Sequence, residues 1–424
     1  MIDIKLLREN SGFVKKNIAK RQDKNLPKLI DEFLLYDGKW RKYKVKLDEL
    51  RKKKNQISLE INKAKKERKN INVLLKEGKE LPDKIKKLET ETDDLKQKID
   101  NSLLRIPNIL HENVPIGKDE KDNRELRKHG QLKKFNFELK NHEDLIESLR
   151  CADFEAGRTN SGQGFNYLLD KVALLDHALQ RYGIDFVLKN GFKLVVPPML
   201  LRRNVLLGAL NGLQDFEQVV YKIENEDIYL IGTAEHSLVT MLKDKLLKKE
   251  ELPIKVCALT SCFRKEIGSH GVDTKGLFRM HQFNKVEQVI FCKPEDSYKY
   301  LEEMQKITEK FFQSLKIPYR VVEICSGDLG NKFAKQYDIE AWFPRQNKYR
   351  EVTSAGNCTD YQARALNIKY LDGKEKKYVH ILNNTMVATS RAMVAIIENY
   401  QEKDGSINIP IVLQPYMCNL KKIK

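Results

Sequence analysis

Apolar residues recur at heptad spacing in two stretches near the start of the chain. The first run steps by four and three through Tyr36, Trp40, Tyr43, Leu47, Leu50, Lys54, Ile57, Ile61 and Ala64, with Lys54 as its one charged member. The second run comprises Leu81, Ile85, Leu88, Thr92, Leu95 and Ile99. Each helix needs a partner to cover its apolar stripe, and the other run is the nearest one. The pattern predicts an antiparallel coiled-coil hairpin with residues 65–80 as a polar tip and Pro82 just beyond it.

The hydropathy pattern changes after about Leu110. Residues 111–130 contain Pro115, Gly117 and dense mixed charge, which predicts a linker. Beyond Gly130, β-like runs fall at 192–196, 219–221, 228–231, 255–259, 286–291, 319–324 and 379–382, and helical patterns at 166–190, 235–248, 295–315 and 387–400. Strands outnumber crossover helices, and several strands follow one another directly. We therefore expect an α+β fold with an antiparallel-rich sheet.

Composition narrows the class of protein. The 424 residues are 41% hydrophobic, enough for a sizeable core, so a wholly disordered protein is excluded. No apolar run approaches 18 residues, so we expect no membrane span. Residues 1–10 mix acids and bases, unlike a secretory signal or a transit peptide. Seven scattered cysteines without a CxxC pair indicate buried apolar filler in a reduced compartment, and we expect a cytoplasmic location.

The formal net charge is +18, and much of the excess lies in the predicted hairpin. Residues 41–100 hold 20 Lys and Arg against 12 Asp and Glu, an excess of 8. This pattern is typical either of a solvated charged face or of a surface that follows nucleic-acid phosphates. The sequence of the hairpin alone leaves both interpretations open.

Residues 262–288 carry the most informative polar pattern. Both ends are β-like, and the middle, 268–276, is rich in glycine and polar residues, which predicts strand, long loop, strand. Arg264 and Glu266 are two apart and are expected on one face of the first strand, and Phe283 is expected on the second strand, with Lys285 and Glu287 on its face. An arginine fork for phosphate, a ring for stacking and a carboxylate for an amine together suit a nucleotide laid across a sheet.

Three further segments add polar groups beside strand or helix ends. "GTAEHSL" places Thr233 and Glu235 after a strand, and "REVTSAGN" supplies Glu351 and Ser354. "LNNTMVATSR" supplies Asn383, Thr385 and Arg391, the last at the start of an apolar helix. A cation beside exposed helix N–H groups suits a polyphosphate. Neither a P-loop nor a GxGxxG motif occurs, which argues against the two commonest nucleotide-binding folds.

These segments together resemble a known family. The segment around Arg264 resembles motif 2 of class II aminoacyl-tRNA synthetases, the Arg391 helix resembles motif 3, and residues 195–198 resemble the proline region of motif 1. The details are those of seryl-tRNA synthetase: the T-A-E triplet at 233–235, "SGDLG…DIEAWFP" at 326–344, "EVTS…NCTDYQAR" from Glu351, and "NNT…R…ENYQ" ending at Gln401. The sequences of these motifs are most similar to those of eukaryotic cytosolic seryl-tRNA synthetases. The resemblance covers nearly the whole chain.

The resemblance implies an architecture, a reaction and partners. We expect a tRNA-binding domain with a coiled-coil arm over residues 1–112 and a class II catalytic domain, an antiparallel sheet flanked by helices, over 113–424. Serine would be activated with ATP and Mg²⁺ to seryl-adenylate, and the seryl group would pass to the 3′ end of serine tRNA, with selenocysteine tRNA as a further candidate acceptor. The family also implies a homodimer, tRNA binding by the arm, and no membrane partner.

The resemblance also assigns site residues. The catalytic residues are expected to be Arg264, Arg391 and Glu351. The ATP-binding residues are expected to be Arg264, Lys265, Glu266, Arg279, Met280, His281, Gln282, Phe283, Glu351, Val352, Thr353, Ser354 and Arg391. L-Serine is expected to contact Thr233, Ala234, Glu235, Arg264, Glu287, Asn383 and Thr385. Glu351 and Ser354 are the expected Mg²⁺ ligands with ATP.

Plainer interpretations stand beside these assignments. Glu235 could help to cap a helix, Phe283 could be a core residue, and the Thr385 hydroxyl could bond to backbone. His270 and His281 have no cysteine at zinc-ligand spacing, so no structural zinc is expected.

The chain also departs from the family pattern at a few positions. Ala355-Gly356 stands where many members have Cys-Ser, His236-Ser237 replaces a more usual Gln-Pro or Val-Pro, and Lys275 replaces a frequent Arg. The rival functions are a non-catalytic paralogue, an enzyme that aminoacylates a carrier protein, and a purely structural coiled-coil protein.

Overall fold

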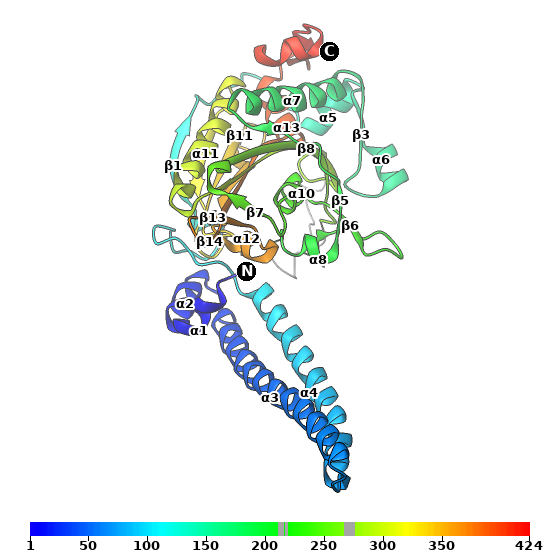
Figure 1. Ribbon diagram of the computed structural model, residues 1–424. Helices are drawn as coiled ribbons and strands as arrows, with labels where there is room; N and C mark the ends of the chain where they lie inside the picture. Colours follow the sequence, from blue (N-terminus) through cyan, green and yellow to red (C-terminus); the bar gives the residue numbers. More distant parts are fainter. Residues whose placement is uncertain (211–215, 217–218, 267–275) are drawn as a thin grey trace. The chain divides into compact units, whose positions relative to one another are not determined.

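The computed structural model describes residues 1–210, 216, 219–266 and 276–424 (Figure 1). These residues form two compact units. One unit, called the arm below, comprises Ile2–Ala19 and Asp23–Ile106. The other, called the sheet unit, comprises Met1, Lys20–Gln22 and Pro107–Lys424.

The arm is helical throughout its length. Its helices are α1 (Ile4–Glu9), α2 (Ser11–Ile18), α3 (Leu26–Lys66) and α4 (Asn72–Arg105). The long helices α3 and α4 run side by side as an antiparallel hairpin (Figure 1). All six members of the second heptad run are buried, and Leu47 and Ile57 of the first run are buried with them. The predicted coiled-coil hairpin is confirmed.

The tip of the hairpin is shorter than predicted. Helix α4 begins at Asn72, so only residues 67–71 join the two helices, and Pro82 lies inside α4. A proline removes one backbone hydrogen bond, but tertiary packing supplies most of the stability of such a helix. That packing begins before Pro82, because a Cβ built on Gly78 would lie 3.6 Å from Cγ2 of Ile57 on α3.

The sheet unit is built on an eight-stranded sheet in the order β1-β10-β11-β12-β15-β9-β8-β4. The strands are β1 (Arg124–His129), β4 (Lys193–Leu194), β8 (Ile254–Phe263), β9 (Gln282–Cys292), β10 (Tyr319–Glu323), β11 (Lys335–Phe343), β12 (Lys348–Asn357) and β15 (His380–Ala388). Six of the seven neighbouring pairs in the described sheet are antiparallel, and β4 with β8 is parallel. The expected antiparallel-rich α+β fold is confirmed.

Helices and short strands surround this sheet (Figure 1). The helices are α5 (His142–Ser148), α6 (Phe154–Ser161), α7 (Asp170–Lys189), α8 (Arg203–Leu206), α10 (Ala234–Thr240), α11 (Ser297–Ser314), α12 (Tyr361–Leu366) and α13 (Thr389–Tyr400). The short strands are β2 (Ala152–Asp153), β3 (Tyr167–Leu168), β5 (Leu200–Arg202), β6 (Ile228–Leu230), β7 (Leu246–Lys248), β13 (Lys369–Asp372), β14 (Glu375–Tyr378), β16 (Ile407–Asn408) and β17 (Lys422–Ile423). No helix among the described residues is long and apolar enough to cross a membrane.

Strand β9 shows how the sheet divides two cores. Val286 and Ile290 pack into the core that contains helices α7, α11 and α13. Val289 and Phe291 pack into a second core with α10 and α12. Successive side chains of a strand point to opposite faces, so one strand serves both cores.

Several other local predictions were wrong. The helix expected at 235–248 ends at Thr240, and Leu246–Lys248 forms β7. Residues 219–221, expected as a strand, are in no strand; beside them the structure has one isolated bridge, between Lys222 and Tyr229. The predicted linker contains β1, an exposed strand at the edge of the sheet. Its sequence, RELRKH, is polar and lacks the apolar alternation by which a half-buried strand is recognised. Arg264 and Glu266 lie beyond the end of β8 at Phe263, because the chain turns there and Glu266 adopts a left-handed φ of 47°.

Candidate active site

A cavity of about 320 Å³ brings most of the predicted site residues together. It is formed by residues from β9, the loops that follow β8 and precede β9, β12, β15 and the starts of α10 and α13. The predicted residues that line it are Thr233, Glu235, Arg264, Glu266, Arg279, Met280, Phe283, Glu287, Glu351, Val352, Thr353, Ser354, Asn383, Thr385 and Arg391. Segments more than 150 residues apart thus converge on one site.

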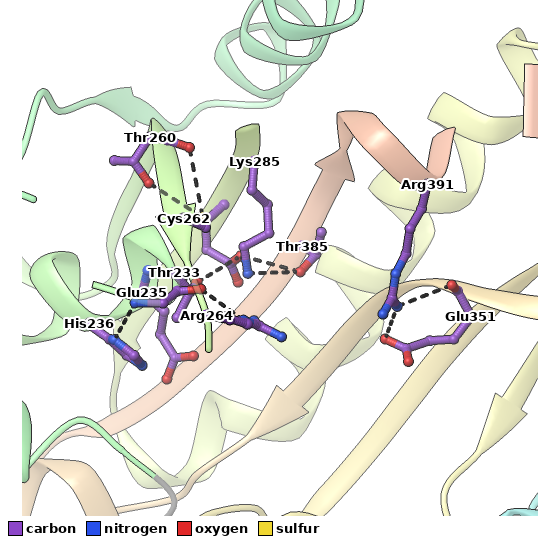
Figure 2. A network of polar contacts seen from close by, with 12 residues as sticks. Thr233, Glu235, His236, Thr260, Cys262, Arg264, Lys285, Glu351, Thr385 and Arg391 are labelled. Carbon is purple, nitrogen blue, oxygen red and sulfur yellow. Dashed lines mark hydrogen bonds and ion pairs between the residues drawn. The ribbon is translucent and has the colours of Figure 1, made fainter. Parts of the chain in front are cut away.

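Arg264 is fixed at one side of the cavity (Figure 2). Its backbone N–H donates to the carbonyl of His281 at 2.9 Å, and its Nε donates to the carbonyl of Gly232 at 3.1 Å. Its guanidinium carbon lies 5.4 Å from the ring centre of Phe283. The cation and the ring are therefore neighbours, although Arg264 is not in the strand.

Arg391 approaches the site from the other side in Figure 2. It is the third residue of α13, so it accompanies the unpaired N–H groups of a helix start. Its Nη1 lies 3.0 Å from Oε1 of Glu351, and it donates to the Glu351 carbonyl at 3.2 Å. Its guanidinium lies 5.0 Å from the ring centre of Phe278, and Arg350 lies 3.8 Å from the same ring. Phe278 thus supports the two cations beside Glu351.

Glu287 is the centre of a buried polar cluster. Its Oε2 accepts hydrogen bonds from the hydroxyls of Thr385 at 3.3 Å and Thr233 at 3.5 Å, and it forms an ion pair with Lys285. Lys285 also donates to Thr385 Oγ1 at 3.3 Å. Burial raises the pKa of Glu287, while the charge of Lys285 opposes that shift. The Thr385 hydroxyl therefore bonds to side chains and not to backbone.

Glu235 belongs to a second buried cluster. Both of its carboxylate oxygens accept from Nζ of Lys332, at 2.5 and 2.7 Å, and Oε1 also accepts from Gln362 at 2.8 Å. Burial is the largest single influence and lowers the pKa of Lys332, but the charge and hydrogen bonds of Glu235, together with Cys358 and Glu287, outweigh it, so the pKa is raised. The residue that caps α10 is Thr233, whose Oγ1 accepts from the Glu235 N–H at 3.3 Å. The Glu235 side chain therefore faces the cavity as part of an ion pair.

His236 and Ser237 have structural partners in the loops beside the cavity. Nδ1 of His236 accepts from the Gly232 N–H at 3.3 Å, and the Ser237 hydroxyl donates to the Pro198 carbonyl at 2.6 Å. Burial lowers the pKa of His236 well below its ordinary value, so the ring is neutral. Since Arg264 donates to the same Gly232, the His236 ring steadies the loop that holds Arg264.

Gly356 is required by its neighbour. A Cβ built on Gly356 would lie 2.1 Å from Cε1 of Phe333, closer than any real contact. The Phe333 ring therefore fills the space where a larger residue at 356 would stand. This gives the Ala355-Gly356 departure a packing explanation.

Comparisons with known proteins identify the family of this chain. The model of the seryl-tRNA synthetase N-terminal domain matches residues 1–110, and that of the tRNA synthetase class II core domain (G, H, P, S and T) matches residues 219–400. A serine–tRNA ligase from Methanospirillum hungatei is 47% identical over 98% of this chain and 99% of its own. This chain belongs to the seryl-tRNA synthetase family. It is thus a class II aminoacyl-tRNA synthetase.

Solved structures of the seryl-tRNA synthetase family superpose on the whole chain. The crystal structure of seryl-tRNA synthetase from Pyrococcus horikoshii complexed with ATP covers 100% of this chain and 99% of its own, with a TM-score of 0.91 and 45% identity. A cytoplasmic serine–tRNA ligase from Naegleria fowleri in complex with AMP has the same coverage, a TM-score of 0.85 and 37% identity. The motif wording favoured eukaryotic cytosolic forms, but the archaeal proteins from Methanospirillum and Pyrococcus are more similar to this chain than the eukaryotic one from Naegleria.

Four predicted ATP or serine residues do not line the main cavity. Ala234 is buried in the core beside α10, and Lys265 lies past the end of β8. His281 precedes β9, stacks on Phe165 at 5.1 Å and lies 2.7 Å from the Tyr221 hydroxyl through Nδ1. Gln282 lines an adjoining cavity of about 170 Å³ that also contacts Phe283.

The expectation that the chain binds no structural zinc stays a prediction. His270 and Lys275 lie outside the described residues. No group of three His, Cys, Asp or Glu side chains in the described part of the chain could hold a metal ion.

Sequence reasoning missed several residues of the site. Lys332, Gln362 and Phe278 were assigned no role, yet Lys332 and Phe278 line the cavity and Gln362 bonds to Glu235. Lys332 follows a stretch with Gly327, Gly330 and Asn331, where a lysine normally indicates a solvated loop. No local signal reveals that its ammonium is buried against Glu235.

Proposed function

We propose that this cavity performs the serine–tRNA ligase reaction of the family. A carboxylate oxygen of serine attacks the α-phosphorus of ATP, the bond to the β-phosphate breaks, and pyrophosphate leaves with the electron pair. A ribose hydroxyl at the tRNA 3′ end then attacks the seryl carbonyl, and AMP leaves. The observation that carries the proposal is the meeting of Arg264 and Arg391 with the buried Glu287–Thr385 cluster in one cavity.

For ATP we propose positioning and charge neutralisation. Arg264 would contact the α-phosphate and the serine carboxylate, and Arg391 the γ-phosphate, with Arg279 as a second cation. Phe283 would stack on adenine, and Glu266 would accept from its amino group. Preorganised cations that do not have to reorient are the main source of catalysis in such sites. The contacts that hold Arg264 to Gly232 and Arg391 to Glu351 support this role.

For serine we propose that Glu287 and Thr385 recognise the side-chain hydroxyl of serine by hydrogen bonding. Both are buried, and Thr233 and Asn383 complete the wall around them. A pocket built to bond a hydroxyl rejects alanine, because its buried polar groups are then left unpaired. Glu235 would face the amino group.

The residues around Glu351 fit Mg²⁺. Ser354 lies opposite Asp338 on the paired strands β12 and β11, and Gln336 donates to both side chains at 3.0 and 3.1 Å. The side-chain amide oxygen of Gln336, Oε1, is buried without a hydrogen-bond partner. Oxygen donors from one or two carboxylates plus substrate phosphates are what Mg²⁺ prefers. Glu351 and Ser354 would hold the ion, which would neutralise phosphate charge when bound.

For the remaining parts of the chain we keep the family assignments as proposals. Residues 1–112 form the tRNA-binding domain, whose lysine-rich arm contacts tRNA phosphates, and 113–424 form the catalytic domain. Residues 195–198 belong to a homodimer interface; exposed apolar side chains there, such as Val196 at 91% exposure, support it. Serine tRNA, with selenocysteine tRNA as a further candidate, is the acceptor. A cytoplasmic location belongs to the same proposal.

Pyrophosphate exchange tests the proposal without tRNA. The full chain is incubated with ATP, Mg²⁺ and serine, threonine or alanine in turn. Exchange with serine alone is expected. No exchange with any of the three would contradict the proposal and favour a non-catalytic paralogue.

A further inference from the structure

Lys332 lies in the amino-acid part of the cavity and is fully engaged with Glu235. The side chains of Lys332 and Glu235 are 6% and 5% exposed, and Nζ reaches both carboxylate oxygens. The ammonium also lies 4.9 Å from the ring centre of Phe333. This is the arrangement that the ammonium of a free amino acid would make with the same carboxylate.

The turn that carries Lys332 is held rigidly within the sheet unit. Arg21 donates to the carbonyls of Leu329 at 2.7 Å and Phe333 at 2.9 Å, on either side of Lys332. Asn108 donates to the Lys332 carbonyl at 3.0 Å. Phe333 itself packs against Gly356. The fold therefore aims the Lys332 side chain into the cavity, and the ion pair is not a chance contact of a flexible surface lysine.

We propose that Lys332 sets the affinity for the amino-acid substrate by competing with the substrate ammonium for Glu235. This inference rests on the proposed function, in which Glu235 faces the amino group of serine. Serine then binds by displacing the Lys332 ammonium from one carboxylate oxygen or by sharing the carboxylate with it. Like charges brought together in a buried site repel each other, so Lys332 weakens the binding of any free amino acid.

The charge balance of the amino-acid pocket points the same way. Arg264, Lys285 and Lys332 contribute three cations to the lining, against the carboxylates Glu235 and Glu287. The surplus positive charge favours the substrate carboxylate and phosphate and disfavours the substrate ammonium. Without Lys332, the serine ammonium would become the charged partner of Glu235.

The test compares Lys332→Met and Lys332→Gln with the wild-type chain. Serine KM is measured in pyrophosphate exchange, and serine affinity is measured by calorimetry. Both variants are expected to bind serine about tenfold more tightly, a typical size for coupling between two occupants. The matched control is Lys335→Met; Lys335 pairs with Glu323 on the neighbouring strands and does not line the cavity, so serine KM should not change.

L-Glyceric acid separates competition from a general enlargement of the pocket. It has a hydroxyl in place of the ammonium, so its inhibition constant should be the same within twofold in the wild type and in Lys332→Met. An equal gain for serine and glyceric acid would contradict the proposal, as would unchanged or weaker serine binding in the variants. Lys332→Gln keeps a hydrogen-bond donor for Glu235, so it serves where Lys332→Met does not fold.

The outcome for Lys332 is distinguishable from the outcome for the proposed function. Serine-dependent exchange by the wild-type chain establishes the function first. If the wild type exchanges with serine and the Lys332 variants show no gain in serine affinity, the inference about Lys332 is wrong while the function stands.

Discussion

The arm and the cavity of the sheet unit use charge in opposite ways. In the arm, Arg51 and Glu89 form a typical ion pair whose side chains are 49% and 40% exposed. In the cavity, Lys332 and Glu235 form a pair that is 6% and 5% exposed. Exposed pairs contribute little stability and are screened by salt, whereas a buried charge that loses its partner is costly. Exposed charge on the hairpin can therefore be replaced with little structural effect, whereas Glu235 and Lys332 in the cavity depend on each other.

The two regions also differ in what holds them together. The hairpin rests on one apolar seam, with Leu47, Ile85 and Leu88 as a small core. The sheet unit has two large cores on the faces of one sheet. Under the proposed function, the arm would provide long-range, salt-dependent attraction of tRNA and the cavity would position the reacting groups.

Replacing Arg264 by Ala should have the largest effect. The variant loses a cation held at the cavity wall by Gly232, and serine-dependent pyrophosphate exchange should fall by about 10²–10³-fold in kcat. Arg181→Ala is the control, because Arg181 pairs with Asp185 on the exposed side of α7. Exchange that stays within a few-fold of wild type in Arg264→Ala would exclude a phosphate role for this residue.

Neutralising exposed lysines should separate the arm from the cavity. Lys52, Lys63, Lys86 and Lys87 are exposed on α3 and α4. If they contact phosphates, changing all four to Gln should weaken tRNA binding by about tenfold or more. The slope of log affinity against log salt should also become shallower, by about 0.7–0.9 for each lost contact. Filter binding at several salt concentrations measures both quantities. An unchanged slope would mean that these lysines form only a solvated face.

Opening a cavity in the seam should weaken the arm. Leu47 is 2% exposed, so Leu47→Ala should lower the free energy of unfolding of the arm by about 2–5 kcal/mol. Leu59 on the same helix is 70% exposed, and Leu59→Ala should change it by less than about 0.5 kcal/mol. Denaturant unfolding followed by circular dichroism compares the two variants. Equal effects would contradict the observed seam.

The last prediction is a pH dependence of stability in the sheet unit. Burial raises the pKa of Glu398 to about 7. The neutral carboxyl favours the folded state, so its contribution is fully present below its ordinary pKa of 4.5 and is lost as pH rises to about 7. Gln cannot ionise, so the Glu398→Gln variant should not lose this stability. Its free energy of unfolding should exceed that of the wild type by up to about 3 kcal/mol between pH 5 and 8.

His142 also contributes to the pH profile. Burial lowers the pKa of His142 to about 4, so its contribution is present above pH 6.5 and is lost as pH falls through 4. Nδ1 of His142 lies 4.0 Å from Oε1 of Glu398, so the two groups can influence each other. The two proteins are therefore compared between pH 5 and 8, where the folded His142 ring is neutral. A difference that does not change with pH would show that Glu398 ionises normally.

The hairpin could be predicted from sequence because a heptad pattern is local. The second seam run is buried at every predicted position. The tip was misjudged at Asn72 and Pro82, because packing of α4 against α3 extends the helix beyond what its local residues favour. Likewise, β1 was read as linker because an exposed edge strand has no apolar alternation.

The cavity could be predicted only through short motifs. Arg264, Phe283 and Arg391 were found because their neighbours form recognisable blocks, although Arg264 lies beyond the strand where it was expected. Lys332 could not be found, because its partner Glu235 is 97 residues away and only the folded sheet unit brings them together. The same is true of the fit between Phe333 and Gly356.

One experiment tests most directly whether the arm contributes to tRNA binding and not to serine activation in the cavity. Pyrophosphate exchange with serine and serylation of tRNA are measured side by side in the wild-type chain and in the variant with Lys52, Lys63, Lys86 and Lys87 changed to Gln. We expect exchange to be unchanged while serylation at limiting tRNA falls by about tenfold or more and depends less steeply on salt. An equal fall in both activities, or no fall in either, would contradict the division of charge between the two regions.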